Sequence, residues 1–122
     1  MQAAERGARL NDQLRVYGKL IRWREFEAAR RYVRPQPEVA GRAPEPSPRL
    51  LSHINVTRYR LQRVELDERG ERAAVTHSLR FYHEDNRREI ATTDRQIWWW
   101  SDATSRWYLH GNVPDFAGAL RS

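Results

Sequence analysis

The proline cluster at residues 34–49 constrains the fold more than any other feature of the sequence. Five of the six prolines lie in it, at positions 35, 37, 44, 46 and 48. Proline fixes φ and has no backbone N–H, so neither a helix nor a central strand can pass through such a segment. The cluster predicts a loop that is too short to separate two domains. Residues 10–122 are therefore expected to form one domain.

The part before the loop has the apolar periodicity of helices. From residue 10, apolar side chains recur at spacings of four, three and four on one helical face: Leu10, Leu14, Tyr17 and Ile21. The period breaks at residues 23–25 and then resumes, which predicts a second short helix ending before Pro35. Residues 1–9 have no apolar periodicity, so we expect them to fray.

The part after the loop has the alternation of β-strands. Four strands are predicted, at residues 54–66, 72–83, 89–101 and 106–110. In the first, the apolar residues change parity between Val56 and Tyr59 and again between Leu61 and Val64. Each change predicts a β-bulge, and a long bulged strand bends. The expected fold is α+β, with N-terminal helices packed on a strongly curved four-stranded antiparallel sheet that forms a cone-like roll.

Two turns set the register of the last three strands. A two-residue turn at residues 85–86 pairs His77 with Asp94, and a turn at residues 102–105 continues the pattern into the last strand. Both registers place the same apolar set on one face, which should receive the helices. This set is Val75, Leu79, Phe81, Ile90, Trp98, Trp100, Trp107 and Leu109.

Polar residues interrupt this apolar face and predict a ligand pocket formed by His77, Thr92, Asp94 and Gln96. Opposite each other, His77 and Asp94 are candidates for a catalytic pair, because a carboxylate beside an imidazole fixes its tautomer and raises its basicity. The alternative is a buried pair with a structural role.

The opposite face of the sheet carries four bulky side chains that have no core to enter. They are Tyr82, Ile97, Trp99 and Tyr108. Aromatic residues are favoured at interface centres, so this patch predicts a homodimer. The alternative is a monomer in which arginine stems cover the rings.

The formal net charge of +6 comes almost entirely from arginine, since Lys19 is the single lysine. The arginines are spread from Arg6 to Arg121 and interleaved with acidic residues. This distribution predicts a solvated surface of mixed charge and argues against nucleic-acid binding. There is no cysteine, no glycine-rich phosphate loop and no close helical spacing of histidines, so no metal and no cofactor are expected.

No apolar run approaches the roughly 20 residues of a membrane span, and no secretory signal peptide is present. A cytoplasmic location is expected by default. A periplasmic lipoprotein whose export signal was trimmed stays open.

The order of elements is familiar from a known superfamily. A helix, a short helix ending in FEAARRYV (Phe26–Val33), a proline-marked loop, long bent strands and the closing RWYL (Arg106–Leu109) resemble the nuclear-transport-factor-2-like superfamily, the cystatin-like α+β roll. The chain looks most like small uncharacterised bacterial proteins of this group. The resemblance covers about residues 10–116. It implies a cone-shaped cavity between helices and sheet, and frequent dimers, but no catalytic residue is carried over.

Three functions remain open at this point. The first is a non-catalytic domain that self-associates and binds a partner or a small ligand in the cone. The second is a small cavity enzyme of isomerase or dehydratase type that uses His77 and Asp94. The third is an arginine-driven nucleic-acid binder, which a continuous basic stripe would favour.

Overall fold

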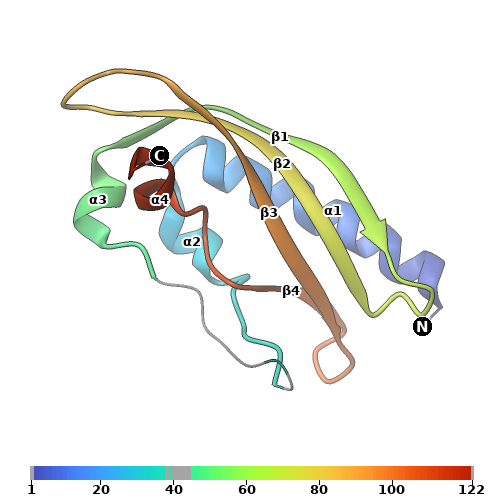
Figure 1. The fold of residues 1–122 in the computed structure, drawn as a ribbon. Coiled ribbons are helices and arrows are strands. Elements are labelled where there is room, and N and C mark those ends of the chain that lie inside the picture. The colour runs from blue at the N-terminus through green and yellow to red at the C-terminus, as the bar shows by residue number, and fades with distance from the viewer. Residues whose placement is uncertain (1, 38, 40–44, 122) are drawn as a thin grey trace.

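Helices pack on the concave face of an antiparallel sheet in this computed structural model, which describes residues 2–37, 39 and 45–121. The sheet has the order β1 (Ile54–Leu66), β2 (Arg72–His83), β3 (Ile90–Ser101) and β4 (Arg106–His110), and it is not closed into a barrel. The other elements are helices α1 (Ala3–Arg22), α2 (Phe26–Arg30), α3 (Pro48–Ser52) and α4 (Phe116–Arg121) (Figure 1). The predicted α+β fold is confirmed.

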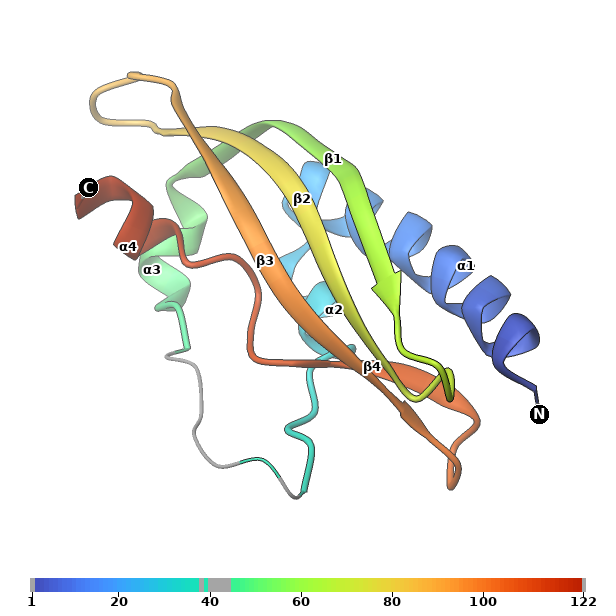
Figure 2. The same ribbon diagram turned by 45° about the vertical axis from the view of Figure 1, so that its right-hand side comes forward.

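Two β-bulges bend β1 over α1 (Figure 2). The pairing of β1 with β2 shifts between Val56 and Arg58 and again between Leu61 and Arg63. These are the two places at which the apolar residues change parity, so both predicted bulges are confirmed. Each bulge leaves one residue unpaired and increases the local twist, which gives the sheet its curvature.

The predicted register of β2, β3 and β4 is confirmed, since His77 lies opposite Asp94 and Trp98 lies opposite Leu109. The predicted two-residue turn between β2 and β3 is wrong. Residues 84–89 form a longer connection, and the positive φ of 54° lies at Arg87. The connection widens because the carbonyl of His83 accepts hydrogen bonds from the N–H groups of both residue 86 and residue 87.

The core forms where the apolar face of α1 meets the sheet. The predicted helical face is confirmed: Leu10, Leu14, Tyr17 and Ile21 are buried. The predicted sheet residues lie in the same apolar cluster, with Ile90 half-buried at its edge. The ring of Tyr17 makes edge-to-face contacts with Tyr32, Tyr59 and Trp98, at centroid distances of 5.8, 6.3 and 5.3 Å.

Helix α1 begins at Ala3, so the prediction that residues 1–9 fray is wrong for the part that is helical. Tertiary contacts hold this first part of the helix, and apolar periodicity does not reveal them. The indole N–H of Trp107 donates to the carbonyl of Arg6 at 2.8 Å. Gly70 has a φ of +67°, and a Cβ there would lie 2.7 Å from the Cα of Ala3, so this close approach requires glycine.

The helices α3 and α4 were not predicted. Helix α3 begins at the end of the expected 34–49 loop, where the hydroxyl of Ser47 accepts a hydrogen bond from the N–H of Leu50 and Pro48 occupies the first turn. Positions 38 and 40–44 of that loop lie outside the described residues. Helix α4 places Phe116 against Phe26 and Phe81, which is how the tail closes one end of the core.

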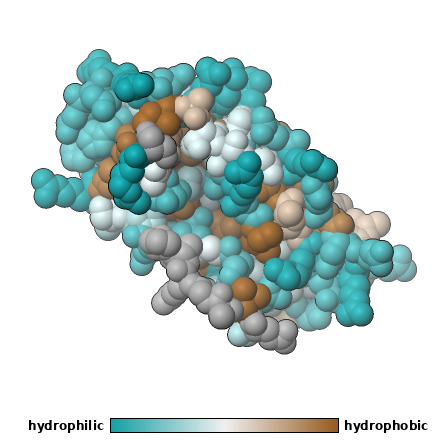
Figure 3. Space-filling view, viewed as in Figure 1, coloured by the Kyte–Doolittle hydropathy of each residue, from teal (hydrophilic) through white to brown (hydrophobic). Residues whose placement is uncertain are grey.

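Most of the surface seen in Figure 3 is hydrophilic, with apolar side chains in small separate patches. Among the described residues, no helix has the length and apolar character needed to cross a membrane.

Replacing Trp107 by Ala should destabilise the protein by about 3–5 kcal/mol, because it removes a fully buried indole together with its hydrogen bond. Urea unfolding followed by circular dichroism measures this. Trp23 is 68% exposed, so Trp23→Ala is the matched control and should change the free energy of unfolding by less than about 0.5 kcal/mol. Similar losses for the two variants would contradict the assignment of the core.

Candidate functional site

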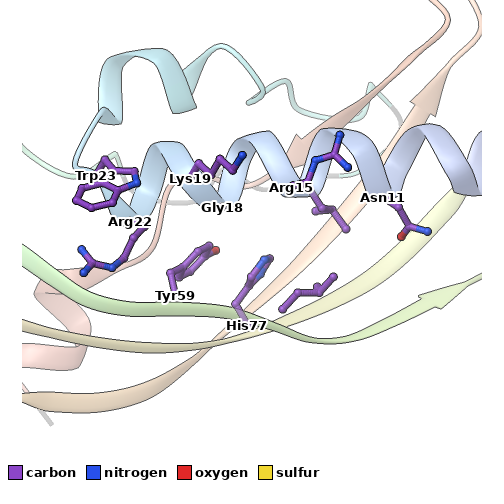
Figure 4. Close-up of a pocket in the computed structure, with 10 residues that line it drawn as sticks. Asn11, Arg15, Gly18, Lys19, Arg22, Trp23, Tyr59 and His77 are labelled. Carbon is purple, nitrogen blue, oxygen red and sulfur yellow. The ribbon is translucent and has the colours of Figure 1, made fainter.

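A groove of about 370 Å³ lies between α1 and the strands β1 and β2. The helix and the residue after it supply one wall: Asn11, Leu14, Arg15, Gly18, Lys19, Arg22 and Trp23. The sheet supplies the floor, where the side chains of Tyr59 and His77 point toward the helix and Leu61 continues the apolar surface (Figure 4). Small-molecule sites have volumes of about 300–1,000 Å³, so the groove has the size of such a site.

Local sequence explains why the groove is open. Gly18 stands in the middle of α1, and the nearest atom that a Cβ at this position would meet is Cδ2 of Tyr59, at 4.0 Å. A longer side chain there would occupy the groove. On the sheet side, Tyr59 and Leu61 lie on the part of β1 between the two bulges, which sets their direction.

The wall of the groove is basic and its floor is apolar and aromatic. Arg15, Lys19 and Arg22 line it, and none of its lining residues is a carboxylate. Arg22 donates to the carbonyl of Val56 at 2.7 Å and lies over the ring of Trp23 at 4.8 Å. Within the described part of the chain, Lys19 makes no ion pair. Such a surface is complementary to a small anion that also carries an apolar group.

His77 lies on the groove floor and is 1% exposed. Its ring stacks on the ring of Tyr59 with a centroid distance of 4.2 Å and an angle of 8° between the planes. Its Nδ1 has no hydrogen-bond partner among the described residues. Burial lowers the pKa of His77 to about 4, because the charged imidazolium is poorly solvated there. The imidazole is therefore neutral at pH 7.

A hydrogen-bonded network lies beneath the groove floor. The hydroxyl of Tyr59 donates to the Asp94 carboxylate at 2.6 Å, and the amide of Gln96 donates to the same carboxylate oxygen at 2.8 Å. The indole N–H of Trp98 donates to the carbonyl oxygen of Gln96 at 2.9 Å. The Tyr17 hydroxyl is buried beside the network without a hydrogen bond of good geometry.

Asp94 is the one acidic group of this network. Burial raises the pKa of Asp94 to about 6, and the hydrogen bonds from Tyr59 and Gln96 act in the opposite direction. Burial also raises the pKa of Tyr59 and Tyr17 well above their usual value, so both hydroxyls stay protonated. At pH 7 Asp94 is mostly ionised, and no basic side chain within the described chain pairs with it.

The four residues of the predicted pocket do not line one common cavity, although Asp94 and Gln96 are hydrogen-bonded to each other. His77 and Asp94 are opposite each other in the ladder, but the carboxylate bonds to Tyr59 and Gln96, and no hydrogen bond joins it to the imidazole. Only His77 lines the groove, whereas Thr92 lines another hollow near α4. The arrangement therefore lacks a carboxylate that orients the imidazole, as a histidine general base usually requires.

Two of the four residues of the predicted interface are covered by the chain itself. The indole N–H of Trp99 donates to the carbonyl of Arg34 at 2.7 Å, and the guanidinium of Arg34 lies 4.3 Å from the ring centre of Tyr108. Tyr82 is half-buried, and Ile97 is 36% exposed. Dimerisation itself stays a prediction.

The spacing of basic residues in the first helix indicates the groove. Arg15, Lys19 and Arg22 are spaced four and three residues apart, which places them on one helical face beside the buried one. Trp23 stands where the helical period breaks. Tyr59 lies opposite this face because of the β-bulge before it. Alternation predicts that bulge but not the direction in which it turns the strand.

No metal site and no relative adds to this description. Among the described residues, no three histidine or acidic side chains are close enough to hold a metal ion. No protein-family model matches the chain, and no match is found among curated proteins or among solved structures.

The opposite pKa shifts of Asp94 and His77 should make single variants respond to pH in opposite directions. The raised pKa of Asp94 gives stability that is present below about pH 4 and is lost as the pH rises to about 6. The lowered pKa of His77 gives stability that is present above about pH 6.5 and is lost as the pH falls to about 4. Relative to the unmodified protein, Asp94→Asn should gain stability with rising pH in this window, and His77→Phe should lose it.

Urea unfolding at several values between about pH 4 and 6.5 tests this, with an expected divergence of about 1.4 kcal/mol for each unit of pKa shift. Asparagine can still accept the hydrogen bonds, and phenylalanine can still stack on Tyr59. The double variant is the control and should again follow the pH dependence of the unmodified protein. Slopes of the same sign for the two single variants would refute the assignment.

Proposed function

We propose that this chain is a non-catalytic binding domain whose groove holds a small anionic ligand with an apolar part. The observation that carries the proposal is the groove itself, with Arg15, Lys19 and Arg22 on one wall and a floor of Tyr59, Leu61 and His77. An anionic group would meet the cations of α1, and an apolar group would lie on the rings and on Leu61.

Two features support binding rather than acid–base chemistry. The carboxylate of Asp94 lies beneath the floor and is occupied by Tyr59 and Gln96. Among the described residues, Nδ1 of the neutral His77 imidazole has no hydrogen-bond partner to orient it or to take its proton. Tyr59 and His77 thus form an aromatic floor, and the cations of α1 supply the polar contacts for a ligand.

The proposal includes membership of the nuclear-transport-factor-2-like superfamily. It is supported by the order of the elements, by the helices on the concave face and by the sheet bent through bulges. It is also supported by the position of the groove between the first helix and the sheet.

Filling the groove at Gly18 should abolish ligand binding without unfolding the protein. The first added carbon of Gly18→Leu meets only Tyr59 at an ordinary contact distance, and replacing a glycine inside a helix favours folding by about 0.5–1 kcal/mol. The probe is 1-anilinonaphthalene-8-sulfonate, an anion with an aromatic body, titrated by fluorescence. We expect saturable binding to the unmodified protein and binding at least about tenfold weaker, a loss of about 1.4 kcal/mol, in the variant.

Val16→Leu is the control, because it adds bulk at an exposed position of α1 that does not line the groove, and it should bind the probe normally. Lys19→Gln should weaken binding about two- to fivefold, since an exposed ion pair contributes about 0.5–1 kcal/mol. Unchanged binding in a folded Gly18→Leu variant would refute the groove as the site.

Self-association is the second part of the proposal, and it centres on Ile97. This side chain is 36% exposed on the outer sheet face, between Ala74 and His110 in the ladder. A twofold axis there would bury the same patch from each copy. Light scattering at micromolar concentration should find a dimer that Ile97→Arg dissociates, whereas the control Leu66→Arg leaves it intact. A strict monomer would end this part of the proposal and leave the groove untouched.

A further inference from the structure

The strands sort the charges of the chain onto one face. Within the strands, the acidic residues are Glu65 and Asp94, and Asp94 points inward. In β1, β2 and β3 the arginines are all at outward positions, and together they are called here the arginine face: Arg58, Arg60, Arg63, Arg72, Arg80 and Arg95. Arginine therefore outnumbers acidic residues on this surface, where Glu65 is the acidic residue that the strands contribute.

The ladder places most of these arginines side by side. Arg58 is paired with Arg80 across β1 and β2. One row further along, Arg60 is paired with Ser78, and in the next row Arg63 and Arg95 flank a threonine of β2. Rows on the same face of a strand are about 6.8 Å apart, so the basic groups form a continuous stripe rather than isolated charges.

Few carboxylates neutralise this stripe. Arg63 is bonded to Glu65 at 2.6 Å, and Arg80 lies 3.5 Å from Glu89. The other four members of the arginine face are exposed and make no ion pair within the described residues: Arg58, Arg60, Arg72 and Arg95. Helices α1 and α2 lie on the other side of the sheet and leave this face uncovered (Figure 2).

The side chains between the arginines are small and carry hydroxyl groups. They are Thr76, Ser78 and Thr93, with Ala91 beside them. A protein partner would need an apolar or aromatic centre in the patch, and stable binding to an anionic membrane usually combines basic groups with an apolar group that enters the bilayer. The arginine rows offer neither. Guanidinium groups bind phosphates in a bidentate manner, and hydroxyl groups add further phosphate contacts.

We propose that the arginine face binds the phosphate backbone of nucleic acid without reading its sequence. Two aromatic residues of the same sheet face, Trp99 and Tyr108, are covered by the chain, and Tyr82 is half-buried, so no fully exposed stacking platform for bases lies beside the arginine rows. The groove lies on the opposite side of the sheet, so its ligand does not depend on this binding. The dimer proposed at Ile97 uses the same outer face, beside the row of Arg63 and Arg95, so nucleic acid and self-association compete for it.

The test is fluorescence anisotropy of the unmodified chain with a fluorescein-labelled DNA duplex of 20 base pairs and unrelated sequences of the same length. We expect binding at 50 mM salt that is equal for all sequences. If three or four phosphates are contacted, the logarithm of the association constant should fall with the logarithm of salt with a slope of about −3. The triple variant Arg58→Gln/Arg60→Gln/Arg95→Gln should bind at least about tenfold more weakly. Its salt slope should be about −1 or closer to zero.

The matched control is the triple variant Arg9→Gln/Arg49→Gln/Arg121→Gln, which removes the same charge from exposed helical positions that line neither the groove nor the arginine face. It should retain the salt slope and lose less than about threefold in affinity. Equal losses in the two triple variants would show that binding follows net charge and would overturn the proposal. It would also be overturned if the duplex did not bind while vesicles containing 30% phosphatidylserine did. Circular dichroism confirms that each variant is folded, and Arg60→Gln alone, at an exposed position, replaces the triple variant if that variant unfolds.

Discussion

The packing of Tyr17 between two layers of rings is the interaction on which the rest of this structure depends. Its fully buried side chain meets Tyr32, Tyr59 and Trp98 edge to face, so one residue of α1 contacts both the segment after α2 and two strands of the sheet. Such contacts contribute about 0.5–1.5 kcal/mol each beyond the area they bury, and they fix orientation as well as distance. The separation of α1 from β1, and with it the width of the groove, follows from this contact.

Most of the fold could be predicted from the side-chain periodicity of the sequence. The two bulges of β1 and the pairing of His77 with Asp94 follow from alternation, which is a local property. Alternation does not predict which hydrogen-bond partner a buried polar group has. Tyr59 takes the Asp94 carboxylate because a bulge turns the strand toward it, and Trp99 is covered because the chain after α2 returns across it. The spacing of Arg15, Lys19 and Arg22 indicates the basic wall of the groove, but its depth depends on the side chain that Gly18 lacks, which periodicity does not show.

Burying one carboxylate and one imidazole in the same layer has a cost that the network only partly offsets. Asp94 receives two hydrogen bonds, whereas Nδ1 of His77 receives none among the described residues. An apolar pair at these positions would avoid the free-energy cost of desolvating the carboxylate and the imidazole. The Asp94 carboxylate is instead held by Tyr59 and Gln96, and the ring of His77 is held by its stacking on Tyr59. The charged side chains of the outer face avoid this desolvation cost, because they stay in water.

The edges of the sheet are finished in different ways. Beside β4, the backbone of residues 32–34 exchanges hydrogen bonds with Leu109, so that edge is occupied. The free edge is β1, whose carbonyls at Ile54 and Val56 accept from Arg24 and Arg22. A long unpaired strand is a template for adding a foreign strand, and bulges and edge-directed cations oppose that addition. Arg22, Arg24 and the irregular ladder of β1 thus oppose the addition of a foreign strand at this edge of an open sheet.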